Sequence, residues 1–403
     1  MEFGPIWRSM LRNKGGFILI AVQIAVTMTI MVNAVAIIQE RSVDMARPSG
    51  LDESNTFALA SVVFIDGIDK KRLIDEDLDL IRNTPGVLSA TSSNSFPLRR
   101  GGWSEGVRLE PGDGVSDSST ALYFADEHTL DAFALRLVEG ENFAPNQVGW
   151  VDWESGGWPP VAIVTEALAN DLFPDEQGSY LGKTFYLGND NPVNIIGVVD
   201  RLQAPWPKWS GLERSMLVPQ RRDTDFVRYI IRTEPGYRDE LMPEIEEMLA
   251  NSNRDRIIQS VRTMEDVRKM AYLGEAAMVK MLIFVVALLT IITGLGIVGL
   301  ASFNVSRRTR QIGIRRALGA TRSSIMRHFM VENFLMSTAG VIAGGVLAVA
   351  LNMLLVESFA LEPMAWYLVP SGMLLLWMVG QAAVAGPARR ASNVTPAIAT
   401  RSI

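Results

Sequence analysis

The side chains best suited to chemistry are arginines that gather in one short segment, residues 304–327. This segment contains no Asp or Glu and seven arginines, namely Arg307, Arg308, Arg310, Arg315, Arg316, Arg322 and Arg327. Read as a helix, it places Ile314, Ala317 and Leu318 on one face, and Gly319 suits the left-handed residue that ends a helix. Such a segment either holds a loop in the cytoplasm or docks in a groove of a partner protein. Nucleic-acid binding does not suit so short a tethered segment.

A carboxylate and three glycines follow this segment within an apolar stretch. Glu332 is costly there unless it is paired, so a structural ion pair with Arg327 or with an arginine of the preceding segment is favoured. Gly340 and Gly344 form a G-x-x-x-G pattern with Gly345 adjacent, which permits close helix approach. The pattern fits a dimer seam and packing within one bundle equally well.

Residues for catalysis or metal binding are scarce. With no cysteine and only two histidines, the chain cannot form a cysteine-ligated or multi-histidine metal site by itself. Serine hydrolysis would require His128 to meet Asp131 and Ser118 or Ser119, which are close only in sequence. The nearest match to a Walker A loop, GSYLGKT at 178–184, has Gln177 where the first glycine is required. We therefore expect no catalytic residue, bound cofactor or metal in this chain.

Four apolar stretches are long enough to cross a bilayer, at residues 17–38, 281–303, 329–356 and 364–386. The fourth is the weakest, because Pro370 and Gln381 interrupt it. The first could instead be a signal peptide, since residues 34–36 read Ala-Val-Ala, but it is longer than the apolar region of most signal peptides.

Charge orients these spans. Residues 39–277 hold 40 acidic and 24 basic side chains, a net charge of −16, whereas the remainder holds 4 and 14, a net of +10. Because basic flanks stay in the cytoplasm, we place segments 1–16, 304–327 and 387–403 inside and 39–277 outside. The sequence therefore predicts an α-helical membrane protein with four transmembrane helices, one before and three after a large extracytoplasmic domain.

The outer domain alternates strands and helices, which indicates an α+β fold. Strands are expected at 57–65, 161–164, 193–199 and 227–232, and helices at 69–83, 165–172 and 243–250. Residues 97–120 and 145–160 read as long loops or an irregular subdomain. Their tryptophans either plug a core, the favoured interpretation, or form a binding surface. Helical segments at 39–47 and 263–280 could extend the first two spans as stalks that act as a lever.

Residues 304–345 resemble the signature of FtsX/MacB-type ABC transporter permeases, in particular the run RRTRQIGIRRALGA that begins at Arg307. Other parts are also similar to that family, including VNIIGVVD at 193–200 and the tail PARRASNVTPAIATR. One position departs from the family pattern, because Gln311 stands where a glutamate is usual.

The resemblance implies a permease subunit in a bacterial inner membrane that works by mechanotransmission. A dimer of a separate cytoplasmic ABC ATPase, which would bind ATP and Mg, would dock on residues 307–319. Within this docking helix the resemblance points to Ile312, Gly313, Ile314 and the neighbouring arginines. Its motion would drive export of a periplasmic peptide, antibiotic or lipoprotein.

Further partners follow from the resemblance. These are a second permease copy or a non-identical sister, which the loss of charge at Gln311 suggests, and a periplasmic adaptor with an outer-membrane channel. The alternative function is a transmembrane regulator or sensor that controls a cell-wall hydrolase or a signalling partner. Co-purification with an ATPase distinguishes the two.

Overall fold

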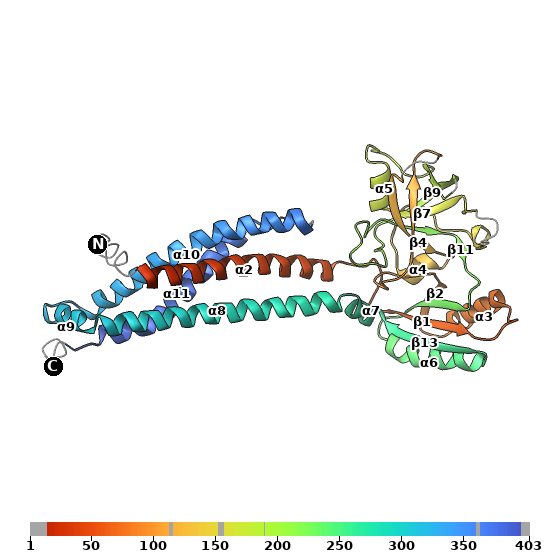
Figure 1. The fold of residues 1–403 in the computed structure, drawn as a ribbon. Helices are drawn as coiled ribbons and strands as arrows, with labels where there is room; N and C mark the ends of the chain where they lie inside the picture. The colour runs from red at the N-terminus through yellow and green to blue at the C-terminus, as the bar shows by residue number, and fades with distance from the viewer. Residues whose placement is uncertain (1–13, 113–115, 152–156, 189, 360–362, 396–403) are drawn as a thin grey trace. The chain divides into compact units, whose positions relative to one another are not determined.

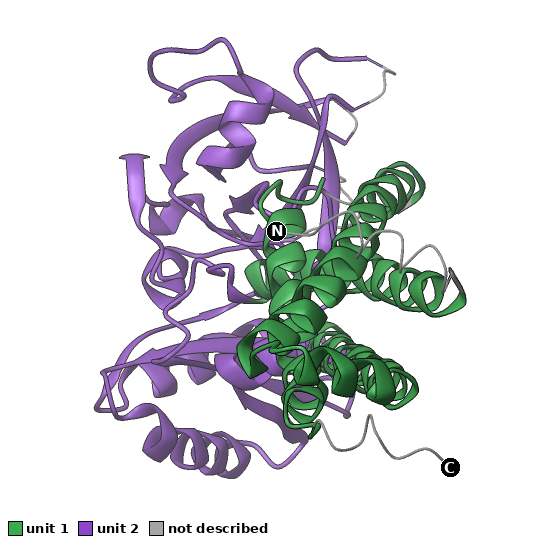
Figure 2. Cartoon of the chain, turned by 90° about the vertical axis from the view of Figure 1, so that its left-hand side faces the viewer, with its two compact units in different colours: residues 1–45, 275–403 green, residues 46–274 purple. Residues whose placement is uncertain are grey.

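The computed structural model describes residues 14–112, 116–151, 157–188, 190–359 and 363–395. The chain separates into two compact units, residues 1–45 with 275–403 and residues 46–274 (Figure 2). We describe each unit by itself. Trp153, most of the expected segment 1–16 and the tail beyond residue 395 lie outside the described residues.

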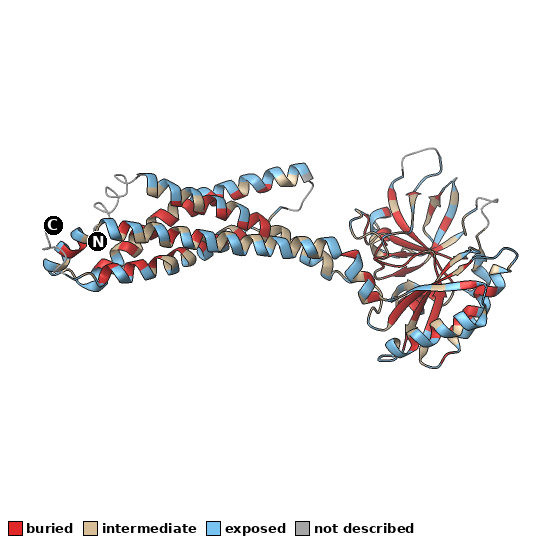
Figure 3. Cartoon of the chain, turned by 60° about the horizontal axis from the view of Figure 1, so that its bottom comes forward, coloured by how far each residue is buried: buried red, intermediate tan, exposed pale blue. Residues whose placement is uncertain are grey.

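The first unit is helical. Within the described residues, four of its helices are long and apolar enough to cross a membrane: α2 (Lys14–Ala46), α8 (Leu273–Arg307), α10 (Arg322–Phe359) and α11 (Leu368–Ser392) (Figure 1). One of them precedes the strands in the chain and three follow. Many of their apolar side chains are exposed, such as Phe284 and Leu295 of α8, at 66% and 65% (Figure 3). Such side chains suit a lipid environment.

The fourth membrane helix starts later than the sequence indicates, and Pro370 does not interrupt it. Pro370 is the third residue of α11, in the first turn, where a backbone N–H has no partner within the helix. Gln381 does lie inside the helix, and its side-chain nitrogen is buried without a hydrogen-bond partner among the described residues. The helix continues to Ser392, beyond the expected end of the span at residue 386.

The second unit contains an antiparallel sheet in the order β13-β1-β12-β2. Its strands are β13 (Arg256–Thr263), β1 (Thr56–Val63), β12 (Phe226–Thr233) and β2 (Val87–Ser92). Helices α3 (Lys70–Arg82) and α6 (Arg238–Ser252) cover one face, where Leu59, Leu78, Tyr229 and Ile245 form a core. Asp69 caps α3 by accepting from Arg72 N, at the start that the sequence indicates.

A second, mixed sheet has the order β5-β9-β7-β10-β4-β3-β8, and β8 also pairs with β9, which closes a ring of strands. Its strands are β5 (Leu137–Gly140), β9 (Asn191–Val199), β7 (Val161–Thr165), β10 (Ser215–Val218), β4 (Ser118–Phe124), β3 (Trp103–Arg108) and β8 (Thr184–Leu187). Thr165 caps the helix α5 (Glu166–Leu172), as predicted. Smaller elements are α4 (Thr129–Phe133), a 3-10 turn (Pro145–Gln147) and the pair β6 (Gly149–Trp150) with β11 (Gln220–Arg221).

The interpretation of residues 97–120 as a long loop is wrong, because β3 and the first residues of β4 lie there. Only Trp103 and Val107 mark the core-facing side of β3, and the surrounding glycines and polar residues hide this alternation. Trp103 and Trp158 pack against the core of the mixed sheet. The centroids of their indole rings lie 6.5 Å apart. These two tryptophans therefore plug a core, as favoured from the sequence.

The expected helix over 263–280 is two helices. Thr263 ends β13 and caps α7 (Met264–Ala271), and α8 starts only at Leu273. Tyr272 separates them: its ring is buried, the guanidinium of Arg268 lies 6.0 Å from the ring centroid, and Gln203 donates to its hydroxyl. The side chain of Tyr272 is thus committed to the second unit. In contrast, α2 continues unbroken through 39–46.

Candidate functional site

The arginine-rich segment forms a short helix, α9 (Thr309–Ala317), between α8 and α10. It ends in a pair of hydrogen bonds, from Gly319 N to Arg316 O (3.2 Å) and from Ala320 N to Arg315 O (3.0 Å). This is the Schellman arrangement, and it requires a left-handed residue, which Gly319 supplies with φ of +94°. The structure therefore confirms the prediction that Gly319 is the left-handed residue that ends this helix.

One face of α9 is fixed to the bundle. Ile312 is only 4% exposed and packs in an apolar cluster with Ile325 and Phe329 of α10 and with Ala388 and Ala391 of α11. The neighbouring Gly313 is also buried. Because interior packing is dense, α9 is held against α10 and α11 and is not a free loop.

The other face of α9 is open and carries both apolar and cationic side chains. Leu318 is 83% exposed and Ile314 is 46% exposed, and Ala317 on the same face is exposed too. The surrounding exposed polar side chains are those of Arg310, Gln311 and Arg315. An apolar centre with a cationic rim fits a groove that has an apolar floor and an acidic edge.

Two arginines of the segment have contacts nearby. The guanidinium of Arg307 lies 5.4 Å from the ring centroid of Phe303, and Arg316 Nη1 donates to Ala320 O at 2.9 Å. Both contacts are local, within four residues. They hold these side chains beside the helix.

Glu332 pairs with Arg308, whose Nη1 lies 3.1 Å from each carboxylate oxygen. Glu332 is 5% exposed, so this is a buried ion pair between the start of α9 and α10. Arg327, the other candidate partner, instead has an exposed side chain. The reason is helical geometry, since residues five apart lie on different faces of α10.

The glycines of α10 pack inside the bundle. A Cβ on Gly340 would lie 2.8 Å from Ile24 Cβ, and one on Gly344 would lie 2.6 Å from Met28 Cβ, both on α2. A Cβ on Gly345 would lie 2.8 Å from Met373 Cε on α11. The sequence leaves open a dimer seam and packing within one bundle. In the structure, these glycines pack within one bundle.

A line of polar side chains along α2 was not predicted from the sequence. These side chains contact α8 and α10 near the middle of the helices, where few competing polar groups are present. The contacts are Gln23 Nε2 to Ile292 O (3.1 Å), Thr27 to Thr293 (2.8 Å), Thr29 to Gly344 O (3.2 Å) and Asn33 Nδ2 to Ala348 O (3.1 Å). Their spacing of four, at residues 23 and 27 and again at 29 and 33, is the signal that could have revealed them.

The residues considered for hydrolysis have other contacts. Ser118 donates to Asp171 Oδ2 at 2.5 Å, and His128 Nε2 lies 3.8 Å from Glu127 Oε1. Lys183 of the Walker-like run pairs with Glu176. These contacts do not join a hydroxyl, an imidazole and a carboxylate among the described residues.

Known families match both units. A model of the MacB-like periplasmic core domain matches residues 17–248, and a model of the FtsX-like permease C-terminal region matches residues 283–396. The extracellular domain of the transporter YknZ from Gram-positive bacteria aligns with 51% of this chain and all of its own, at 20% identity and a TM-score of 0.32.

Full-length relatives are similar over longer stretches. A macrolide export ATP-binding/permease protein MacB of Photorhabdus laumondii is 23% identical over 97% of this chain and 59% of its own length. The uncharacterised ABC transporter permease YknZ of Bacillus subtilis is 24% identical over 68% of this chain and 67% of its own length. The chain thus spans about three fifths of that MacB. With a family model matching more than half of its residues, the chain belongs to the ABC transporter permeases of the MacB/FtsX type.

Proposed function

We propose that this chain is the permease subunit of an ABC transporter whose separate ATPase docks on α9 from the cytoplasm. The ATPase, as a dimer, would bind ATP and Mg, and the permease would turn the closure of that dimer into motion outside a bacterial inner membrane. The observation that carries the proposal is the two-faced character of α9. Its exposed side offers Ile314 and Leu318 within a cationic rim, and its buried side is fixed through Ile312.

The packing of α9 suits the transmission of force. A push on its exposed face acts on α10 through the Ile312 cluster and through the Arg308–Glu332 pair. The same bundle holds α2 against α10 by close glycine contacts. Because packed helices shift as bodies rather than deforming continuously, a displacement of α9 moves several membrane helices together.

The second membrane helix, α8, suits a connection to the second unit, residues 46–274, which we call the outer unit. α8 has 35 residues without a break, which at about 1.5 Å per residue is about 52 Å and exceeds the roughly 30 Å hydrocarbon core. Its first eight residues, Leu273–Lys280, extend beyond the uncharged stretch that begins at Met281. A helix of this length carries displacement past the membrane surface.

The complete machine, in this proposal, contains two permease subunits, either identical or not. Gln311 is exposed on α9 where the family pattern has a glutamate, so this subunit offers its ATPase one charge fewer. The cargo is a periplasmic peptide, antibiotic or lipoprotein that an adaptor passes to an outer-membrane channel. The macrolide export in the names of the MacB relatives favours a role in efflux.

Affinity purification in a mild detergent, with mass spectrometry of the retained proteins, tests the docking. We expect an ABC ATPase with the native chain and a loss of at least about tenfold with the double variant Ile314→Asp and Leu318→Asp, because charges would enter an apolar groove. Both side chains are exposed, so the yield of folded permease should be unchanged. The matched control, Ile314→Val with Leu318→Met, should retain the ATPase.

Two results would contradict the proposal. One is recovery of the native permease without any ATPase, which would favour a sensor or regulator. The other is equal ATPase recovery with the Asp variant, which would move the docking site away from α9.

A further inference from the structure

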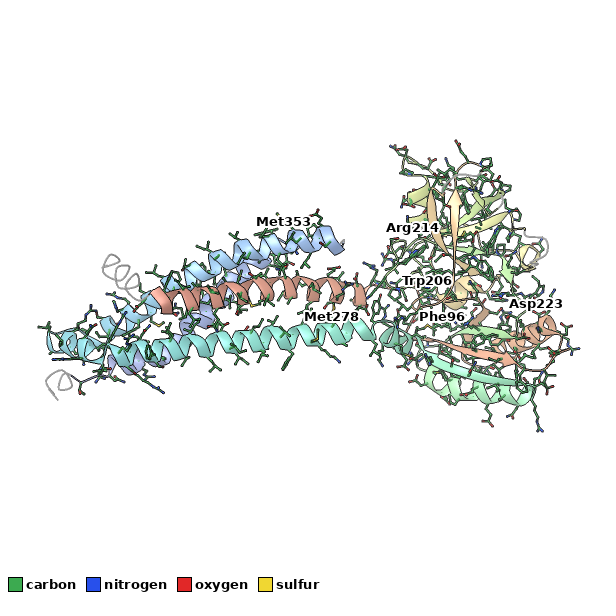
Figure 4. The ribbon with its side chains drawn as sticks, in the orientation of Figure 1. Phe96, Trp206, Arg214, Asp223, Met278 and Met353 are labelled. Carbon is green, nitrogen blue, oxygen red and sulfur yellow. The ribbon has the colours of Figure 1, made fainter. Side chains whose placement is uncertain are left out.

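The outer unit contains a cavity of about 260 Å³ on the face of the β13-β1-β12-β2 sheet that α3 and α6 do not cover. Strands, the segment after β2 and helix α7 all contribute to its wall. Phe96, labelled in Figure 4, lies on the segment after β2 and lines the cavity. Every lining residue belongs to the second unit.

The alternation of side chains along the strands explains why the sheet is hollowed at this place. Phe57 and Leu59 of β1 point to the core beneath the helices, so Ala58 and Ala60 point to the opposite face. Their direct cross-strand neighbours are Arg262 on β13 and Arg228 on β12. Two small side chains beside two long ones leave a hollow with an apolar floor and cationic walls.

Among the described residues, no Asp or Glu lines this hollow, whereas four arginines from three separate segments do: Arg99, Arg100, Arg228 and Arg262. Burial and the nearby charges of Arg99 and Arg222 lower the pKa of Arg228 to about 10. Burial also lowers the pKa of Arg99. Like charges that repel one another in a partly desolvated site are stabilised by a bound anion.

The contacts of these arginines leave donors to spare. Arg228 Nη1 donates to Asn94 O at 3.1 Å, Arg99 Nη1 to Gly101 O at 2.7 Å, and Arg262 Nη1 lies 3.1 Å from the sulfur of Met270. Each guanidinium has five N–H donors, and the contacts that these three make within the described residues include no carboxylate. Planar donors in such numbers match the oxygens of phosphate or carboxylate groups.

The backbone around the cavity is strained. The described chain has five non-glycine residues with positive φ, and three of them line this cavity: Leu98 (66°), Arg100 (67°) and Ser260 (57°). Ser260 lies at the irregular pairing between β1 and β13, and Arg100 N is held by Pro205 O at 2.8 Å. Strain of this kind persists where the surroundings over-determine it, and it gathers at ligand sites.

We propose that this cavity binds a small amphipathic oxyanion, with a phosphate or carboxylate head among the four arginines and a short apolar part on the alanine floor. Phe96 and Val267, both buried, complete the apolar side. The volume is below the roughly 300–1,000 Å³ of sites for drug-sized ligands, so the apolar part is short. The site lies outside the ATPase-docking face, so this proposal does not depend on the proposed docking of an ATPase.

The position of the site suits control by its ligand. Val267, Met270 and Ala271 of α7 line it, and only Tyr272 separates α7 from the membrane helix α8. An occupant that fixes α7 therefore acts one residue before the chain enters α8. A small anion in this cavity can therefore influence the outer end of α8, the helix that we propose carries displacement.

Binding can be tested on the full chain in nanodiscs of zwitterionic lipid, with hexyl phosphate as the probe. Line broadening of its phosphorus resonance reports binding directly, and inorganic phosphate and hexanol serve as separate arms. We expect hexyl phosphate to bind at least about tenfold more tightly than either, since both its charge and its alkyl chain find partners. Discs that contain an anionic lipid show whether a lipid headgroup competes, which would identify the membrane as the source of the same chemistry.

Variants distinguish the site from adsorption to the surface. Arg228→Gln with Arg262→Gln should weaken hexyl phosphate binding about tenfold or more, and Ala60→Leu should reduce it to the level of inorganic phosphate by filling the floor. The control is Arg136→Gln, an exposed arginine that pairs with Asp200, and it should bind as the native chain does. Unchanged binding in the double arginine variant, hexanol binding equal to that of hexyl phosphate, or no binding by the native chain would each overturn the proposal.

Discussion

Arg308 Nη1 lies 3.1 Å from both carboxylate oxygens of Glu332, across 24 residues of chain that include the whole of α9. Glu332 is almost fully buried and Arg308 is about one-fifth exposed. The pair therefore fastens the start of the proposed docking helix to α10. It is the polar counterpart of the apolar contact that Ile312 makes on the same helix.

Glu332→Gln should destabilise the bundle, because it removes the charge that Glu332 places beside the guanidinium of Arg308. Removing one partner of a buried pair costs about 3 kcal/mol, measurable as unfolding in mixed micelles of mild detergent and dodecyl sulfate. The matched control is Arg327→Gln, which changes an exposed arginine on the same helix and should unfold like the native chain. Equal losses of stability in both variants would show that the contact between Glu332 and Arg308 does not stabilise the bundle specifically.

Gly344→Ala should destabilise the contact between α2 and α10. The added Cβ would lie 2.6 Å from Met28 Cβ and 2.8 Å from Ala25 O, and backbone cannot move aside as a flexible side chain can. We expect a loss of about 1–3 kcal/mol in the same unfolding measurement.

Gly299→Ala is the control for this change. It also lies in a membrane helix, but a Cβ there meets nothing within 4 Å. It should be neutral or stabilise by up to about 1 kcal/mol, since alanine favours helix more than glycine does. A loss at residue 299 that matches the loss at 344 would mean that glycine flexibility, and not close packing, is what matters.

Tyr123 and Tyr229 should ionise only when the outer unit unfolds. Burial raises the pKa of Tyr123 well above its ordinary value, and burial together with the charge of Asp77 does the same for Tyr229. A raised pKa in the folded state means that the stability is fully present below about pH 10 and is lost as the pH rises further.

Tyrosinate absorbance during an alkaline titration measures this. The native chain should show a late step that coincides with loss of structure, and Tyr123→Phe or Tyr229→Phe should each remove part of it. A late step that precedes unfolding, or that survives both buried variants, would argue against this assignment.

The membrane helices could be predicted because long apolar runs have few alternatives in water. The capped helices at Asp69 and Thr165 could be predicted because their signals are local. The break at Tyr272 could not, because it depends on Gln203 and Arg268, which only the folded domain brings to that ring.

Part of the candidate site was also accessible from sequence alone. The arginines of α9 are contiguous, so their concentration is visible in one window. The arginines of the cavity come from positions 99–100, 228 and 262, and only the register of β1 with β12 and β13 brings them together. The sequence limits the partner of Glu332 to the arginine segment but does not identify Arg308. The orientation of α9 decides which arginine faces α10.

If α8 transmits displacement as a rigid connector, Ala277→Pro should uncouple its ends. Residue 277 is the fifth of α8, so proline there removes a helical hydrogen bond and clashes with the preceding turn, at a cost of about 3 kcal/mol. In the reconstituted complex, the ATPase should still bind and α9 should still change its hydrogen exchange with nucleotide. The outer unit should no longer respond.

Ala277→Leu is the matched control for this test. Residue 277 is exposed, and leucine keeps the backbone N–H and favours the helix. The response of the outer unit should therefore persist in this variant. If the outer unit also responds in Ala277→Pro, displacement reaches it by another route, and α2, which is unbroken from Lys14 to Ala46, becomes the connector to test next.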